Sequence, residues 1–229
     1  MMNYISVAID GPSGAGKSTV ARAAAARLGY VYVDTGAMYR AIGLAACRKG
    51  IAGEDADSIA AMLPAIDIRL VYQGGTQHIL LNGEDVSDAI RTPEIARYAS
   101  KVSAVPAVRQ FLLETQRDMA KNGNILMDGR DIGTVILPDA PVKIFLTASV
   151  ETRAARRYLE LAGKGQQVTR EGVLRDVVER DRQDMSRAVA PLRQAADAVL
   201  LDTSEMTLEE SIKAVLAIIQ KKTEENRGV

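Results

Sequence analysis

Ile5-Ser6-Val7-Ala8-Ile9, followed by Gly11-Pro12-Ser13-Gly14-Ala15-Gly16-Lys17-Ser18, is the stretch that decides the fold. The first five residues favour a β-strand, and Gly11-Pro12 ends it. Residues 17–28 predict an alanine-rich helix that ends at Gly29. The loop matches the Walker A pattern, which is a glycine, four further residues and then Gly-Lys-Ser. This pattern is expected between a strand and a helix, as it is here. The segment therefore predicts a loop that wraps a polyphosphate.

The residue types of this loop suit that chemistry. Backbone N–H groups can surround phosphate oxygens only where the chain tolerates positive φ and a close approach, and glycines supply both. Lys17 is expected to contact the β- and γ-phosphates, and the Ser18 hydroxyl to bind Mg²⁺. The helix that follows points its positive N-terminal end at the phosphates. The predicted ATP-binding residues are Gly11, Pro12, Ser13, Gly14, Ala15, Gly16, Lys17, Ser18 and Thr19.

The rest of the chain alternates apolar strand-like runs with helical periodicity. Predicted strands after the first are residues 30–33, 125–127, 142–146 and 199–201, and predicted helices include 38–49, closed by Gly50, and 208–222 with a frayed polar end. Alternation of this kind indicates an α/β protein with a parallel sheet that is covered on both faces.

Two regions depart from this alternation. Residues 67–72 and 77–81 alternate polar and apolar side chains around Gly74-Gly75, which predicts an antiparallel hairpin inserted in the α/β body. Helical periodicity then runs over 92–122, with a break at Pro106.

A long charged helical region over residues 150–188 is interrupted by Gly163-Lys164-Gly165-Gln166-Gln167. Because this interruption is polar and glycine-containing, it is a candidate for a mobile lid.

Composition narrows the class of protein. The chain has 229 residues, 47% of them hydrophobic, and 29 basic against 29 acidic side chains, so no global field would hold it on nucleic acid. The N-terminus lacks the basic start and apolar length of a signal peptide, and no segment has the length of a membrane span. A single cysteine, Cys47, excludes an internal disulfide. We expect a cytoplasmic monomer that binds neither nucleic acid nor membrane.

Other chemistries find little support in the residue inventory. His78 is the only histidine, so neither a catalytic triad nor a zinc cluster can be assembled. Arg40 and Arg130, in contrast, each lie just past a predicted strand, on the side where ligands bind parallel sheets. Guanidinium groups suit the crowded phosphates of a phosphoryl transfer, although an ordinary surface arginine is the alternative for each of them.

Several further motifs carry a family resemblance. In order and spacing the chain resembles the bacterial cytidylate kinases of the P-loop nucleoside monophosphate kinase family through GPSGAGKS (11–18), DTGAMYR (34–40), GEDVS (83–87), IRT (90–92), DGRDIGT (128–134), PDAPVK (138–143), ERD (179–181) and RAVAPL (187–192). The resemblance covers essentially the whole chain. It implies a three-layer α/β/α fold with a five-stranded parallel sheet, a core of residues 1–34, 122–152 and 170–229, a nucleotide-acceptor region with an insertion at about 35–121, and a lid at about 153–169.

The resemblance also implies roles for individual residues. Those expected to face the cytosine are Thr35, Arg109 and Asp131; those for the ribose are Ser100, Arg180 and Asp184; those for the acceptor phosphate are Arg40, Arg130 and Arg187. With Lys17, the three phosphate arginines would be catalytic. Arg153, Arg156 and Arg157 precede the polar break and would close over ATP, and of these Arg153 and Arg157 are the predicted ATP-binding pair.

Simple chemistry supports the choice of base. An aspartate accepts a hydrogen bond from the exocyclic amine of cytosine, whereas uracil presents a carbonyl there and would face an unfavourable pair of acceptors. Many members of the family have serine where Thr35 stands, and threonine keeps the hydroxyl.

Alternatives stay open for several of these side chains. The four-residue spacing of Arg180 and Asp184 equally suits a solvated ion pair within a helix, and exposed helix arginines are the alternative for the lid residues. Asp34 and Asp128 each end a predicted strand, so either could bind Mg²⁺ through water or orient a loop, and Asp128 could cap a turn.

The sequence thus predicts in-line transfer from Mg·ATP to CMP or dCMP. A phosphate acceptor is already nucleophilic at neutral pH, so no general base is needed. One alternative is a P-loop kinase for another nucleotide or small metabolite. Another is a non-catalytic nucleotide switch or nucleic-acid binder, which should show a guanine-reading Asn/Thr-Lys-x-Asp motif or a basic aromatic stripe; the sequence has neither.

Overall fold

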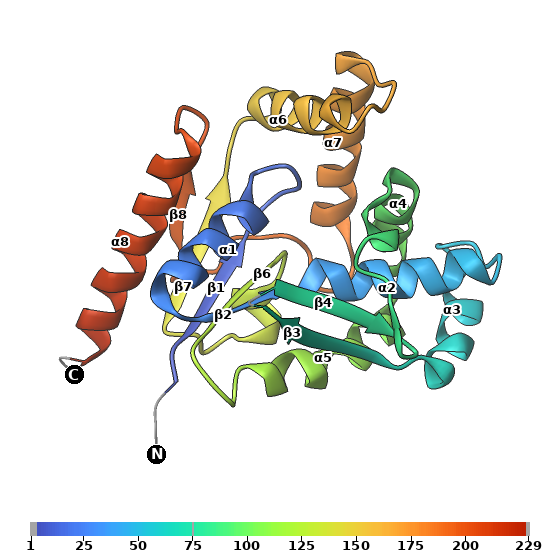
Figure 1. Ribbon diagram of the computed structural model, residues 1–229, viewed down its shortest axis with the longest axis horizontal. Coiled ribbons are helices and arrows are strands. Elements are labelled where there is room, and N and C mark those ends of the chain that lie inside the picture. Colours follow the sequence, from blue (N-terminus) through green and yellow to red (C-terminus); the bar gives the residue numbers. More distant parts are fainter. Residues whose placement is uncertain (1–3, 75, 228–229) are drawn as a thin grey trace. The chain divides into compact units, whose positions relative to one another are not determined.

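The structure, a computed structural model, describes residues 4–74 and 76–227. Residues 1–3 of the predicted N-terminus and Gly75 of the predicted turn lie outside this range. The chain forms two compact units, the first built from the residues up to Tyr32 and from Ala120 onward, and the second from Val33 to Met119 (Figure 1). Each unit has its own hydrophobic core.

A five-stranded sheet with the order β2-β6-β1-β7-β8 carries the first unit. Its strands are β1 (Ser6–Asp10), β2 (Val31–Asp34), β6 (Ile125–Gly129), β7 (Val142–Thr147) and β8 (Val199–Asp202). Strand β1 pairs in parallel with β6 and β7, and β7 pairs in parallel with β8. The central position of β1 explains its uninterrupted apolar run, because a parallel strand inside a sheet is buried on both faces. The predicted α/β class with a five-stranded parallel sheet is confirmed.

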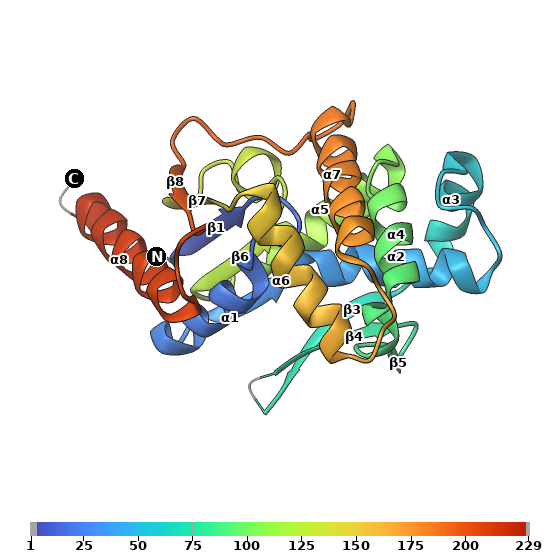
Figure 2. The ribbon, with the colours of Figure 1, turned by 90° about the horizontal axis from the view of Figure 1, so that it is seen from above.

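The helices of the first unit follow the predicted pattern. Helix α1 (Lys17–Leu28) lies beside α8 (Leu208–Arg227), as Figures 1 and 2 show, and both contribute to the apolar core over β1 and β7. Helices α6 (Val150–Gly163) and α7 (Arg170–Ser186) flank the predicted polar break.

The predicted frayed end after Lys222 is wrong, because α8 continues five residues further to Arg227. Side-chain pairs one turn apart support this extension: Lys222 lies 3.0 Å from Glu225, and Gln220 donates to Glu224.

The second unit packs helices around a small antiparallel sheet. Its helices are α2 (Thr35–Arg48), α3 (Ala56–Met62), α4 (Pro93–Val102) and α5 (Pro106–Met119), with short 3₁₀ turns η1 (Leu63–Ala65) and η2 (Ala89–Arg91). Strands β3 (Ile68–Gln73) and β4 (Thr76–Leu81) form the predicted hairpin, with Val71 opposite His78. A third strand, β5 (Glu84–Asp85), pairs with β4 and was too short to be predicted.

Local chemistry explains the ends of these helices. Helix α2 begins three residues before the predicted Met38 because the Asp34 carboxylate accepts the N–H of Ala37 and caps the first turn. The predicted break at Pro106 is confirmed, since α4 ends at Val102 and Pro106 is the first residue of α5, where its missing N–H costs nothing.

Candidate active site

The Walker loop connects β1 to α1 in the first unit and has the backbone that its glycines predict. Gly11, Gly14 and Gly16 all have positive φ, and Gly16 caps α1 in the left-handed region. A Cβ on Gly11 would lie 1.9 Å from the Leu146 carbonyl oxygen, so no other residue fits there. The loop therefore presents its backbone at the N-terminus of a helix, an arrangement that suits phosphate oxygens.

Lys17 folds back over this loop. Its side chain is buried, with 4% of the residue exposed, and Nζ donates to the carbonyl oxygen of Pro12 at 2.7 Å. Burial, followed by the positive charge of Arg130, lowers the pKa of Lys17 to about 7. A bound phosphate group would raise the pKa of Lys17 again, because an opposite charge favours the ammonium form.

Ser18 lies beside a carboxylate. Its hydroxyl donates to Oδ2 of Asp128 at 2.8 Å, and the hydroxyl of Tyr32 donates to Oδ1 of the same carboxylate at 2.8 Å. Hydroxyl and carboxylate oxygens are the donors that Mg²⁺ prefers, so Ser18 and Asp128 fit a Mg²⁺ held largely by phosphates and water. Within the described residues, no group of three or more His, Cys, Asp or Glu side chains could hold a metal by itself.

Tyr32 was missed by sequence reasoning. The available signal was a tyrosine in a predicted buried strand, since a buried phenol needs a hydrogen-bond partner. Asp34, the other predicted metal candidate, caps α2 in the second unit and has Oδ2 3.6 Å from Arg40. Its role as a metal ligand stays a prediction.

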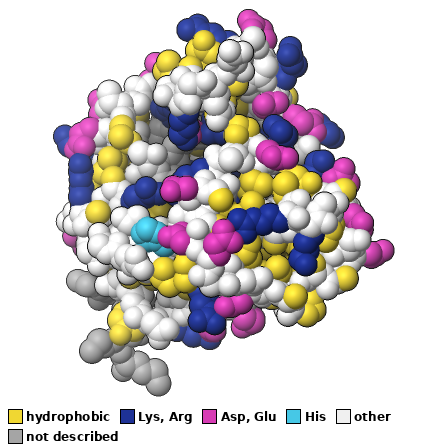
Figure 3. Space-filling model, turned by 45° about the vertical axis from the view of Figure 1, so that its right-hand side comes forward, with side chains coloured by type: hydrophobic (Ala, Val, Ile, Leu, Met, Phe, Trp, Pro, Cys, Tyr) yellow, Lys and Arg dark blue, Asp and Glu magenta, His cyan; other side chains and the backbone are white. Residues whose placement is uncertain are grey.

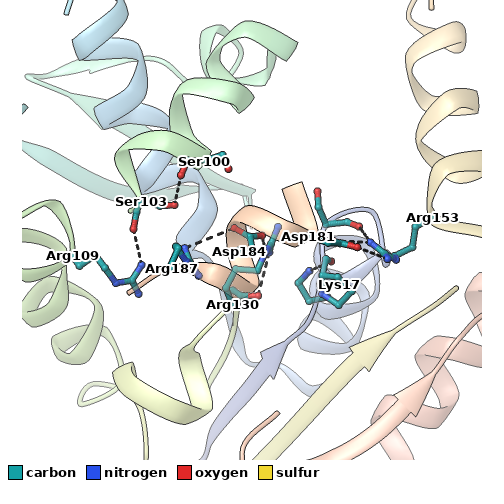
Figure 4. A network of polar contacts seen from close by, with 12 residues as sticks. Lys17, Ser100, Ser103, Arg109, Arg130, Arg153, Asp181, Asp184 and Arg187 are labelled. Atoms are coloured by element: carbon teal, nitrogen blue, oxygen red, sulfur yellow. Dashed lines mark hydrogen bonds and ion pairs between the residues drawn. The ribbon is translucent and has the colours of Figure 1, made fainter. Parts of the chain in front are cut away.

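A cluster of arginines and a carboxylate forms elsewhere in the first unit, as Figure 4 shows. Nε of Arg130 donates to Oδ2 of Asp184 at 2.9 Å, and NH1 of Arg187 lies 3.9 Å from Oδ1 of the same side chain. Burial by itself would raise the pKa of Asp184, but Arg130, Arg187 and Arg180 outweigh burial and hold this pKa below its ordinary value. The fold thus brings together residues 54 positions apart in the chain around one ionised carboxylate.

Arg130 is held from a second direction. Its NH1 donates to the carbonyl oxygen of Gly129 at 3.2 Å. Asp131, which follows it, is buried and precedes a single π-helical turn, η3 (Ile132–Ile136), that the sequence did not predict. Turns of this kind are rare and frequently occur at functional sites.

The predicted lid arginines separate into two kinds. Arg153 is almost fully buried: it forms a two-pronged ion pair with Asp181, at 3.0 and 2.6 Å, and donates to the carbonyl oxygen of Ser13 in the Walker loop. Arg156 similarly lies within 3.4 Å of the Ala15 carbonyl oxygen. Arg157 instead pairs with Glu160 on its own helix.

In the structure, Arg153 therefore contacts the backbone of the loop. Asp181 was missed by sequence reasoning. Glu179 and Asp181 both carry a carboxylate and differ only in the helix face that they occupy. The packing of α6 on α7 decides which of the two is buried.

The predicted acceptor residues of the second unit also form a connected group. NH1 of Arg109 donates to the carbonyl oxygen of Ser103, and the hydroxyl of Ser103 donates to the carbonyl oxygen of Ser100 (Figure 4). The Arg109 guanidinium lies 5.6 Å from the centre of the Tyr39 ring, a cation–π distance. Thr35 is buried in the first turn of α2. Sequence reasoning missed Ser103 and Tyr39, although Tyr39 belongs to the DTGAMYR motif.

His78 has a surface role in this unit. Figure 3 shows the only histidine, in cyan, at the surface beside acidic side chains, and Nδ1 of His78 lies 2.9 Å from Asp85. The pair links β4 to β5 and leaves the histidine outside the groups described above.

Comparisons with known proteins show the family of this chain. The family model described as cytidylate kinase matches residues 7–221. The chain belongs to the cytidylate kinase family. It is 51% identical over 220 residues to the cytidylate kinase of Geobacter sp. (strain M21), covering 96% of this chain and 94% of that protein. It is 49% identical over 222 residues to the cytidylate kinase of Syntrophotalea carbinolica, covering 97% and 94%.

Solved structures support the fold alone. A gluconokinase from Sinorhizobium meliloti 1021 matches with a TM-score of 0.50 and 17% identity, over 97% of this chain and 95% of that one. In the described part of the chain, no helix is both long and apolar enough to cross a membrane.

The arrangement in the first unit suits a cytidylate kinase because it combines backbone donors, a buried lysine and partly buried arginines. Phosphoryl transfer needs positioning and cations more than proton transfer. A carboxylate such as Asp184 holds the arginine side chains in place before substrate arrives, so the cations need little reorganisation during the reaction.

Proposed function

We propose that this member of the cytidylate kinase family transfers the γ-phosphoryl group of Mg·ATP to CMP and dCMP, producing ADP and the nucleoside diphosphate. The observation that carries the proposal is the convergence of Arg130, Arg187 and Asp184 in the same unit as the Walker loop. The family match makes a kinase for another small metabolite the less favoured reading.

On the donor side, the Walker loop and Lys17 bind the ATP phosphates. When bound, Mg²⁺ neutralises charge between the phosphates, and Ser18 with Asp128 holds it directly or through water. The hydrogen bond between these two side chains supports this assignment. Arg153 steadies the loop through the Ser13 carbonyl, and Arg157 binds ATP after it releases its ion pair with Glu160 on the same helix.

On the acceptor side, three groups of residues bind the three parts of CMP. Arg40, Arg130 and Arg187 bind the phosphate; Ser100, Arg180 and Asp184 bind the ribose; Thr35, Arg109 and Asp131 bind the cytosine. The low pKa of Asp184 supports a role as a hydrogen-bond acceptor, since the side chain is ionised at neutral pH. Residues 35–121 act as the acceptor region and residues 153–169 as a lid that excludes water during transfer. A cytoplasmic, monomeric state stays a prediction.

Production of ADP by the purified protein tests the proposal. Mg·ATP is supplied with CMP, dCMP, UMP, AMP, GMP or shikimate in parallel. Turnover should be strong with CMP and dCMP and weak with the others. It should collapse in D131A but persist in D139A, which removes an exposed aspartate from the same segment. Activity mainly with another acceptor would overturn the base recognition, and no transfer to any acceptor would favour a nucleotide switch.

A further inference from the structure

Asp10, the last residue of β1, joins the start of the Walker loop to the segment that carries Arg130 and Asp131. Its Oδ1 accepts the N–H of Ile132 and its Oδ2 accepts the N–H of Gly133, both at 2.7 Å. Asp10 immediately precedes Gly11 in the chain, whereas the two donors lie 122 and 123 residues away. One carboxylate therefore connects the donor loop to the first two residues of η3.

The connection is rigid for three reasons. Both bonds are short and have an ionised acceptor, which makes each roughly twice as strong as a bond between neutral groups. The carboxylate uses a separate oxygen for each N–H, so it resists rotation as well as displacement. A Cβ on Gly133 would lie 3.4 Å from Oδ2 of Asp10 and 3.1 Å from Cδ of Lys143, so the carboxylate is closely packed.

Burial of an ionised carboxylate at the end of β1 costs free energy. Asp10 is 5% exposed, and burial raises its pKa to about 6; the N–H groups of Gly133 and Ile132 and the positive charge of Lys17 oppose this rise, and Asp131 adds to it. Arg130 also interacts electrostatically with Asp10. A position needed only for packing would be filled as well by an uncharged side chain.

We propose that Asp10 is a positioning residue for the phosphoryl acceptor: by holding the backbone of Ile132 and Gly133, it fixes Arg130 and Asp131 relative to the Walker loop. The inference rests on the proposed function, because it gives those two residues contacts with CMP. Asp10 touches neither substrate. Its effect on the reaction passes mainly through the main chain of residues 130–133, which the two hydrogen bonds attach to the end of β1 beyond the pairing of Asp10 with Gly129 in the sheet.

The variant D10N tests this assignment. An asparagine keeps one acceptor oxygen but turns its NH₂ toward the other N–H, so one of the two bonds becomes a contact between donors. Because a misplacement of about 1 Å can cost about 100-fold in rate, we expect kcat with CMP to fall about 10-fold or more and KM for CMP to rise. The affinity for an ATP analogue and the circular dichroism spectrum should stay unchanged.

A matched control is D202N. Asp202 also ends a strand of the same sheet and accepts a loop N–H, from Ser204 at 2.8 Å, but it is exposed and its partner lies only two residues further along the chain. Its kinetics should stay within about 2-fold of the original chain, as expected for a surface change. If D10N loses affinity for ATP and CMP equally, or keeps both kcat and KM for CMP, the inference is overturned.

If D10N fails to fold, G133A provides the second test. The added methyl would lie 3.1 Å from Cδ of Lys143 and in contact with Oδ2 of Asp10 at 3.4 Å, so the backbone of Gly133 must shift away from the carboxylate or from the lysine. We expect about a 3-fold loss of kcat with ATP affinity retained; unchanged kinetics would overturn the inference. Failure of the proposed function can be distinguished from failure of this inference. It would appear in the unsubstituted chain, as the absence of CMP phosphorylation.

Discussion

The Walker loop and the arginine cluster, which we propose serve the two ends of one phosphoryl transfer, are built in different ways. The loop is continuous in sequence, and its geometry follows from glycines with positive φ between β1 and α1. The cluster is assembled from the residue after β6 and the C-terminal end of α7, where Arg130 and Arg187 each lie beside Asp184. The loop acts mainly through its backbone, whereas the cluster acts through buried charges that balance one another.

This difference explains how each region tolerates change. A backbone site depends on a few conformations that only glycine adopts, and most of its side chains are secondary. A charge cluster depends on every member, since removal of one partner leaves another charge buried without its counter-ion. Substitutions should therefore separate the two regions by the substrate whose binding they affect.

The largest effect is expected from K17M in the loop. Methionine fills the buried space but removes the ammonium group that we propose contacts the transferred phosphate, so kcat should fall on the order of 10³-fold. Steady-state ADP production measures this change. Retention of more than about a tenth of the activity would contradict a role for Lys17 in stabilising the transition state.

A smaller but still large effect is expected from R130M in the cluster. Loss of the guanidinium should lower kcat/KM for CMP about 100-fold, and the control R130K should restore only part of it, because lysine cannot fork around two oxygens. Full activity in R130K would show that charge alone matters at this position.

The variant D184N should affect stability as well as activity. Asp184 is buried and its pKa is held low by Arg130, Arg187 and Arg180, so its loss leaves buried guanidinium groups unbalanced. We expect the free energy of unfolding to fall by about 3 kcal/mol at pH 7 in urea titrations. Because the folded-state pKa is depressed, this contribution is present above the ordinary pKa of 3.8 and disappears as the pH falls through the lower folded value.

We expect kcat to change several-fold with pH. The pKa of Asp10 is raised to about 6, so lowering the pH through 6 protonates the carboxylate and replaces one acceptor with a hydroxyl. At saturating CMP, kcat should therefore decline below pH about 6 in the original chain. The same decline in D10N would assign it to another group, such as the CMP phosphate, whose second pKa is about 6.

The smallest effect is expected from Y32F. Phenylalanine keeps the ring, which lies 5.4 Å from the Arg22 guanidinium, and removes the hydrogen bond to Asp128. KM for Mg·ATP should rise about 3-fold, the cost of one hydrogen bond that orients a carboxylate. Titration of ATP at fixed excess Mg²⁺ would detect it, and an unchanged KM would remove Tyr32 from the donor site.

Much of the fold could be predicted because its signals are local. Residues 17–28 form the predicted helix to the residue, since the Walker loop sets its start and Gly29 its end. The start of α2 was placed too late because capping by Asp34 depends on a side-chain hydrogen bond that periodicity does not record. The two-residue strand β5 was missed because only its pairing with β4 makes it a strand.

The site shows the same division. The residues of the Walker loop follow from their spacing, whereas the acceptor residues rest on the family resemblance and stay a prediction. Asp10, Tyr32, Asp181 and Ser103 were missed because each acts on a partner that is distant in the chain or buried by packing. The pairing of Asp184 with Arg130 likewise depends on the tertiary fold, although the helical spacing of Arg180 and Asp184 was visible in the sequence.

The most direct test of this division measures the binding of two ligands to K17M and R130M. The ligands are an unreactive ATP analogue and CMP, and each is titrated separately. If the loop serves the donor and the cluster serves the acceptor, K17M should bind the analogue at least about 10-fold more weakly and keep its affinity for CMP, and R130M should do the opposite. Equal weakening of both ligands in R130M, or loss of CMP binding in K17M alone, would contradict this division.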